Sequence, residues 1–181
     1  MIKKFINKLL GKSTPGTSGG KPHFGKREEV PASVHGINPE LVDRRAADVV
    51  ATLKQAGFEA YIVGGAVRDL LLGLRPKDFD VATNATPEQV KGLFRRAFII
   101  GKRFRIVHVV HGRGREHEVI EVSTFRAYLD NAAAGQVAGN EKTSKAQLSG
   151  MQHAVDASGR VLRDNVWGPQ DEDATRRDFT V

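Results

Sequence analysis

Two aspartates one residue apart, Asp78 and Asp80, are the strongest candidates for chemistry in this sequence. They lie in the segment KDFDV, where Phe79 and Val81 predict a strand with one apolar face. Alternation along a strand places both carboxylates on the other face, roughly 6–7 Å apart. Two ionised carboxylates at that spacing repel each other, and a divalent cation relieves the repulsion. Hard oxygen ligands suit Mg²⁺, although an isolated Asp-x-Asp pair is weak evidence because exposed pairs also arise by chance.

A Gly-Gly turn lies upstream of these aspartates, between a predicted strand at Tyr61–Val63 and a predicted short helix. The backbone amides of Gly64 and Gly65 can approach an anion closely, because neither residue has a side chain. Arg68, one turn into the helix, can place a guanidinium on the same phosphate. The alternative is a structural turn in which Arg68 and Asp69 form a surface ion pair. The spacing matches neither a Walker A loop nor a G-x-G-x-x-G fingerprint.

Further acidic side chains are candidates to join the pair. Glu121 lies in an otherwise apolar predicted strand, and a neighbouring strand would project it at the same metal. The alternative is an ordinary solvent-facing glutamate. Glu118 differs from it in parity and is expected to face the other way. Near the end of the chain, Arg176 and Arg177 favour the ionised form of Asp178, and this group either orders a phosphate or forms a surface pair.

The composition is that of a globular protein. The chain has 181 residues, with 28 Lys and Arg against 21 Asp and Glu and a net charge of +7. This excludes collagen-like, low-complexity and wholly disordered classes. The absence of cysteine excludes disulfide scaffolds, cysteine zinc sites and thiol nucleophiles, and it suits a reducing compartment, so we expect a cytoplasmic protein. No run approaches 18 apolar residues, so no membrane-spanning helix is predicted.

The positive charge is concentrated in two parts of the chain. Residues 1–30 hold seven basic and two acidic residues, which leaves 21 and 19 for the remainder. Residues 91–115 hold eight basic residues and no acidic one, which suits an anionic partner. A solvated basic face is the alternative. Within this stretch the candidates for binding RNA or phosphate are Lys102, Arg103 and Arg105.

The chain divides into a basic N-terminal extension, residues 1–36, and one domain, residues 37–181. The extension is expected to be flexible, since residues 11–20 have linker composition, and its amphipathic first ten residues allow a weak contact with an anionic membrane surface. A small, polar stretch at about 130–150 predicts a mobile insertion. The chain stops on an apolar segment with no capping signal, which indicates an element cut in the middle and a piece of a longer protein.

The pattern of apolar residues predicts a mixed α/β fold, a mixed sheet with flanking helices. Strands cluster rather than alternating strictly with helices. The predicted elements are a helix from the N-cap Asn38 to a stop at Gly57, strands at 61–63, 79–81 and 97–100, a helix from the capping box at Thr86 to about Arg96, and a hairpin of 105–110 with 118–123.

Four segments, taken in order, resemble the poly(A) polymerase/tRNA nucleotidyltransferase family in its bacterial, class II form. They are YIVGGAVRD at Tyr61–Asp69, KDFDV at Lys77–Val81, EVSTFR at Glu121–Arg126 and RRDFTV at Arg176–Val181. The resemblance extends from about Ile37 to the last residue. It implies a nucleotidyltransferase-type head domain and the transfer of nucleotides from a nucleoside triphosphate to an RNA 3′ end.

The resemblance also implies roles for individual residues. Asp78 and Asp80 would hold two Mg²⁺ ions, with Glu121 as an auxiliary metal-binding carboxylate, and Asp178 would be the third catalytic aspartate. The RNA 3′-hydroxyl would attack the α-phosphorus of ATP and pyrophosphate would leave, with no covalent enzyme intermediate. The residues implied for the triphosphate are Gly64, Gly65 and Arg68.

The segment IIGKRF at Ile99–Phe104 is typical of bacterial poly(A) polymerases, whereas the CCA-adding branch usually has a Gly-Thr-Val pattern there. The resemblance therefore favours template-independent polyadenylation of RNA with ATP. CCA addition to tRNA is the alternative, and a non-catalytic RNA-binding module is a second one. The family's base-selecting region lies beyond these 181 residues, so this piece alone is expected to be inactive or unselective.

Overall fold

The computed structural model describes residues 27–112, 117–127, 135–136, 153–155 and 161–177. Most of the predicted extension, nearly all of the predicted insertion, and Asp178 lie outside the described residues. The proposed division at residue 36 therefore stays a prediction. Within the described ranges, no helix combines the length and the apolar character that crossing a membrane requires.

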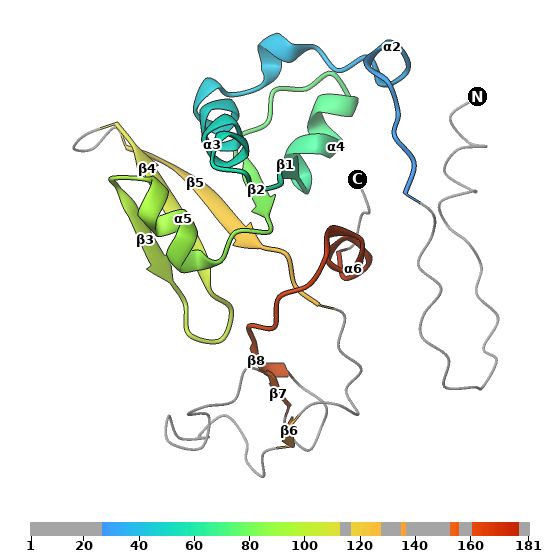
Figure 1. Ribbon diagram of the computed structural model, residues 1–181. Coiled ribbons are helices and arrows are strands. Elements are labelled where there is room, and N and C mark those ends of the chain that lie inside the picture. The colour runs from blue at the N-terminus through green and yellow to red at the C-terminus, as the bar shows by residue number, and fades with distance from the viewer. Residues whose placement is uncertain (1–26, 113–116, 128–134, 137–152, 156–160, 178–181) are drawn as a thin grey trace, which may run out of the picture.

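A five-stranded mixed sheet forms the centre of the protein, which confirms the predicted fold class (Figure 1). The strand order is β1-β2-β5-β4-β3, in which β2 and β5 run parallel and the other neighbours run antiparallel. The strands are β1 at Ala60–Val63, β2 at Asp80–Thr83, β3 at Ala97–Ile100, β4 at Ile106–His111 and β5 at Glu118–Thr124.

Two helices, α3 at Arg44–Gln55 and α5 at Pro87–Leu93, lie on one face of this sheet (Figure 1). We call this the covered face. The hydrophobic core lies between helices and sheet, where every fourth or third residue of α3 meets alternate residues of the strands. The sequence predicts helices flanking a mixed sheet, but not which face of the sheet they cover. Its most deeply buried members include Ala46, Val49, Leu53, Val81, Val107 and Val122.

The start of α3 differs from the prediction. Asn38 caps only a 3₁₀ turn, Pro39–Leu41, and the helix begins after a second cap, Asp43, whose carboxylate accepts the backbone N–H of Arg45 at 2.8 Å. Two caps five residues apart divide what the apolar spacing presents as one helix. A short helix, α2 at Ala32–His35, precedes them and is not predicted.

The capping box of α5 is confirmed, since Thr86 and Gln89 exchange side-chain and backbone hydrogen bonds. The predicted end near Arg96 is wrong, because the helix stops at Leu93. Phe94 is already extended, and the carbonyl of Arg96 accepts the backbone N–H of Val110 at 2.9 Å. Pairing with the neighbouring strand therefore takes over before the helical pattern ends.

The remaining described elements are helix α4, a second sheet and helix α6. Helix α4, Gly65–Leu71, follows the Gly-Gly turn as predicted. A second sheet, of order β6-β7-β8, contains Gly135–Gln136, His153–Val155 and Val161–Asp164. Helix α6, Gln170–Thr175, follows it and is not predicted. It packs near the end of β5 (Figure 1).

Candidate active site

One row of side chains crosses all five strands on the face opposite the helices, which we call the open face. Strand register places Val63, Asp80, Glu121, His108 and Phe98 side by side in this row. The residues that follow Asp80 and Glu121 in their strands, Val81 and Val122, belong to the covered face. Alternation therefore presents two carboxylates to solvent from adjacent parallel strands.

Asp78 and Asp80 are both exposed, and Phe79 between them is buried in the core, so the predicted alternation is correct. The strand itself begins only at Asp80, and Asp78 lies in the segment leading into it. Partial burial raises the pKa of Asp80, and the negative charges of Glu121 and Asp78 raise it further, while Arg177 opposes them. The site is thus one in which negative charge accumulates without full compensation.

Glu121 reaches the predicted position beside Asp80, on the neighbouring strand, and its role as a metal ligand stays a prediction. Its Oε1 lies 3.3 Å from Nε2 of His108, the next residue of the row. Glu118, three residues earlier, lies on the other face with its carboxylate 3.4 Å from the guanidinium of Arg45 in α3. The parity prediction for these two glutamates is therefore confirmed.

The Gly-Gly turn lies directly beside Asp80. Gly64 has φ of +72°, in the region that favours glycine, and a Cβ there would lie 3.7 Å from Oδ2 of Asp80. Arg68 pairs with Asp69 at 2.7 Å, and its guanidinium lies over Gly65, where a Cβ would be 3.6 Å away. The surface ion pair of the alternative interpretation is therefore present. It is exposed and so weak enough to exchange for a phosphate.

A pocket of about 300 Å³ opens on the same face, between the sheet and α6. Both carboxylates and arginines line it. The pKa of Arg126 is lowered, chiefly by burial. The pocket therefore offers guanidinium groups to an anion and carboxylates to a cation. Its charged lining residues are Asp80, Glu121, Arg126, Asp173, Arg176 and Arg177.

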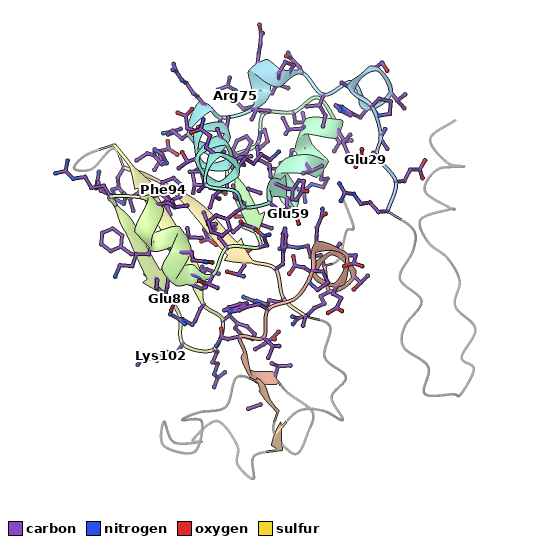
Figure 2. The ribbon with its side chains drawn as sticks, in the orientation of Figure 1. Glu29, Glu59, Arg75, Glu88, Phe94 and Lys102 are labelled. Carbon is purple, nitrogen blue, oxygen red and sulfur yellow. The ribbon has the colours of Figure 1, made fainter. Side chains whose placement is uncertain are left out.

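The predicted phosphate-binding cations differ in their surroundings. Arg105 forms an ion pair with Glu88 of α5, and its backbone N–H donates to the side chain of Asn165 at 3.1 Å. Lys102 and Arg103 are exposed, and no ion pair within the described ranges involves either. Figure 2 shows Lys102 and Glu88 at the same end of the molecule. Of the three, Lys102 and Arg103 retain the greater freedom to meet an anion.

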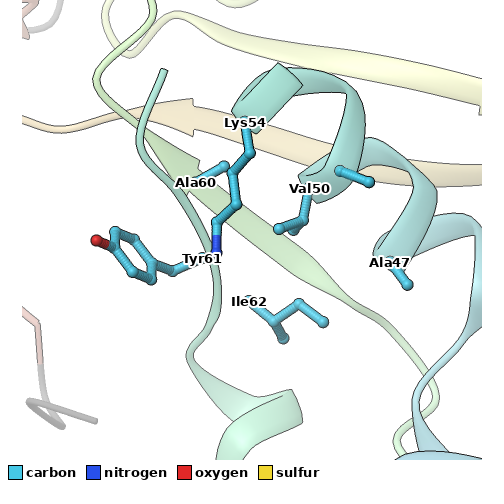
Figure 3. Close-up of a pocket in the computed structure, with 7 residues that line it drawn as sticks. Ala47, Val50, Lys54, Ala60, Tyr61 and Ile62 are labelled. Carbon is cyan, nitrogen blue, oxygen red and sulfur yellow. The ribbon is translucent and has the colours of Figure 1, made fainter. Parts of the chain in front are cut away.

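A larger pocket, of about 460 Å³, lies between α3 and the edge strand β1 (Figure 3). Its lining is mainly aliphatic, and Lys54 extends from α3 across to β1, with Nζ 5.5 Å from the centre of the Tyr61 ring. None of the predicted site residues lines it. The size of a pocket therefore does not identify the candidate active site. The smaller pocket is the one lined by the charged candidate residues.

Sequence reasoning missed three residues at the site: His108, Arg126 and Asp173. Strand parity was the signal for His108, because it shares a face with Ile106 rather than with the core residue Val107. Arg126 lies in the segment EVSTFR, but no local pattern shows that it meets α6. The position of Asp173 depends on a helix that is not predicted. Asp178, by contrast, is predicted and lies outside the described residues.

The chemistry of the site fits a divalent cation. Carboxylate oxygens are hard ligands, and the raised pKa of Asp80, caused by burial and then by neighbouring carboxylates, indicates repulsion that a cation relieves. Among the described side chains, no cluster of three or more His, Cys, Asp or Glu residues is arranged to hold a metal. Magnesium needs no such cluster, since one or two carboxylates plus substrate phosphates commonly suffice.

Comparison with known proteins places this geometry in a family. A family model described as the poly A polymerase head domain matches residues 60–181. The chain belongs to this family. It is 41% identical to poly(A) polymerase I of Salmonella typhi over 182 residues, 99% of this chain and 35% of that protein. It is 47% identical to poly(A) polymerase I of Haemophilus influenzae over 153 residues, 84% of this chain and 30% of that protein.

Proteins named CCA-adding enzyme are also similar to the chain, at lower identity. The CCA-adding enzyme of Bacillus pumilus is 37% identical over 135 residues, 72% of this chain and 33% of that enzyme. A solved structure of a CCA-adding enzyme in its apo form II has a TM-score of 0.50 at 20% identity and covers 77% of this chain and 28% of that one, which supports the shared fold. The chain spans about a third of the length of the curated relatives it matches.

Proposed function

We propose that the protein transfers AMP from ATP to RNA 3′ ends without a template. The observation that supports this proposal is that strand register places the carboxylates of Asp80 and Glu121 side by side at a pocket also lined by arginines. The chain is 41–47% identical to proteins named poly(A) polymerase I. A pure RNA-binding module gains nothing from carboxylates placed where a polyanion must approach. The site is therefore better suited to catalysis than to binding alone.

In the proposed reaction the 3′-hydroxyl oxygen of RNA bonds to the α-phosphorus of ATP. The bond from that phosphorus to the bridging oxygen breaks, pyrophosphate leaves with the bonding electrons, and the hydroxyl proton passes to water. Asp78 and Asp80 would hold Mg²⁺, in two sites, with Glu121 as an auxiliary ligand. Bound magnesium would supply neutralisation of the phosphate charge that develops.

The chain's own residues bind and orient the substrates in this proposal. Gly64 and Gly65 offer backbone amides to the triphosphate, and Arg68 exchanges its exposed pair with Asp69 for a phosphate. Lys102 and Arg103 attract the RNA backbone, and Arg105 supports their loop through its contact with Glu88. Asp178 is proposed as the third catalytic aspartate. Holding both substrates in reach of each other supplies much of the rate.

The decisive experiment measures Mg²⁺-dependent incorporation of labelled AMP into an RNA oligonucleotide by the full-length protein. Asp80→Ala is expected to abolish incorporation and to leave RNA binding intact. Asp48→Ala, an exposed aspartate on α3, is the matched control and is expected to keep wild-type activity. Undiminished incorporation by Asp80→Ala rejects the proposed site.

CCA addition to tRNA is the second candidate function, because the CCA-adding enzyme of Bacillus pumilus also matches. The higher identity to poly(A) polymerases over more of the chain favours polyadenylation. ATP and CTP are offered with an unstructured RNA and with tRNA lacking its CCA end. Long A tails on the unstructured RNA support our proposal, and termination after CCA on tRNA overturns it.

A further inference from the structure

Asp173 is a buried carboxylate at the edge of the pocket and has no role in the function proposed above. Its residue is 7% exposed, and both oxygens are occupied. Oδ1 accepts the backbone N–H of Arg126 at 3.0 Å, and Oδ2 accepts Nε of Arg177 at 2.9 Å. A second guanidinium nitrogen of Arg177 also lies 2.9 Å from Oδ2. A buried charge is tolerated when it is paired in this manner.

A short antiparallel pairing of the backbone brings the segment before Asp173 back to the end of β5. Residues 125–127 pair with 166–168, through hydrogen bonds of 2.9 Å from Ala127 N to Val166 O and 3.1 Å from Gly168 N to Phe125 O. A Cβ on Gly168 would lie 2.5 Å from Cα of Ala127, so only glycine permits this approach. Helix α6 therefore starts against the end of β5 and directs Asp173 toward the open face.

The pairing fixes the direction in which Arg177 points. One edge of its guanidinium lies on Asp173, and its terminal nitrogen lies 3.4 Å from Oγ of Ser123 on β5. A guanidinium has five N–H donors, and these contacts use Nε and the second terminal nitrogen, Nη2, so the two N–H donors of Nη1 remain for a ligand. Arg177 lines the same pocket as Asp80 and Glu121, and its positive charge opposes the rise in the pKa of Asp80. Arg177 is therefore part of the wall of the pocket that holds the carboxylates.

We propose that Asp173 is a positioning residue for nucleotidyl transfer, which holds the guanidinium of Arg177 toward the phosphates of the incoming nucleoside triphosphate. This inference rests on the proposed function. Without the carboxylate, Arg177 regains the rotamer freedom of a long side chain, and binding must then restrict it again. The Nη1 group of Arg177 suits a phosphate because each of its two N–H groups can donate a charge-assisted hydrogen bond to a phosphate oxygen.

A double-mutant cycle in the full-length protein tests this role. Asp173→Asn keeps the size of the side chain and an oxygen for Arg126 N–H, but it removes the charge that orients Arg177. We expect kcat/KM for ATP to fall by about 100-fold, mainly through KM, since small misplacements at a site cost that much. Arg177→Gln should cost a similar factor. The double variant should be no worse than Arg177→Gln alone, because the two residues act as one unit.

A purely structural role gives a different result. Losses in the double variant that multiply, or a wild-type kcat/KM in Asp173→Asn, overturn the proposal. Asp171→Asn, on an exposed residue of the same helix, is the matched control and should keep wild-type kcat/KM. If Asp173→Asn does not fold, Asp173→Glu replaces it, because this variant keeps the ion pair and displaces the guanidinium. It should lose about 10-fold in kcat/KM at wild-type Tm, and wild-type kcat/KM in this variant overturns the proposal.

A binding measurement separates this inference from the proposed function. The affinity for a non-hydrolysable ATP analogue in the presence of Mg²⁺ is measured by calorimetry for the wild type and the same variants. Analogue binding that weakens in Asp173→Asn, and not further in the double variant, supports the positioning role even if the wild type incorporates no AMP. That failure of incorporation would reject the proposed function alone. Equal binding by wild type and Asp173→Asn overturns the inference.

Discussion

The two faces of the central sheet are made by the same strands and have opposite properties. On the covered face Val81, Val107 and Val122 are at most 1% exposed and pack under α3 and α5. On the open face their neighbours in sequence, Asp80, His108 and Glu121, are polar and lie in one row. A two-residue period thus separates the residues that stabilise the fold from those of the candidate site.

The difference shows where the protein accepts an unfavourable arrangement. Apolar burial on the covered face contributes stability in proportion to area. On the open face, partial burial and the charges of Glu121 and Asp78 raise the pKa of Asp80, so ionisation there is unfavourable in the folded chain. Repulsion of this kind is useful when a cation is to be bound, and functional sites are commonly less stable than the remainder of the protein for that reason.

The largest effect on stability is expected from comparing two substitutions on neighbouring strands, one on each face of the sheet. Val122→Ala removes two buried methyl groups from the covered face and should lower the free energy of unfolding by about 2 kcal/mol. Asp80→Asn, on the open face, should instead raise Tm at neutral pH, because the raised pKa of Asp80 means that stability is lost as its carboxyl ionises with rising pH. Thermal unfolding of both variants at neutral pH checks this. A fall in Tm for Asp80→Asn would contradict the claim that the charge of Asp80 destabilises the folded protein.

A smaller effect is expected at the cap of the helix that covers the sheet. The hydrogen bond from the side chain of Arg45 is the main cause that lowers the pKa of Asp43 to about 2. The stabilisation from Asp43 is therefore complete above pH about 4 and is lost as pH falls toward 2. Asp43→Ala should cost about 1 kcal/mol at neutral pH and less below pH 3. Urea unfolding at several pH values measures this, with Asp48→Ala in the helix interior as the control. A pH-independent cost contradicts the assignment.

The smallest effect concerns two glutamates of one strand on opposite faces. Because the charge of Glu121 raises the pKa of Asp80, Glu121→Gln should lower that pKa. Glu118→Gln, whose partner is Arg45 on the covered side, should leave it unchanged. NMR titration of the Asp80 carboxyl carbon in the metal-free protein gives both values. Equal shifts in the two variants would show that parity does not decide which charges reach the site.

Local patterns predicted much of the fold for identifiable reasons. The capping box at Thr86, the glycine turn after β1 and the alternation around Phe79 each depend on residues close in sequence. Predictions failed where a distant partner decided the outcome. The end of α5 was wrong because Arg96 pairs with Val110, and α6 was missed because its position depends on pairing between residues 125–127 and 166–168.

The sequence by itself determined the family and the kind of chemistry that we propose for this site. Aspartates at alternate positions share a face because a strand has a period of two, and ordered motifs identify the family. Only the tertiary structure decided which other groups meet them. Strand register placed Glu121 beside Asp80, and the backbone return at Gly168 brought Asp173 and Arg177 to the same pocket. The physical reason is that register and chain return depend on contacts between residues 40 to 100 positions apart, which no local spacing encodes.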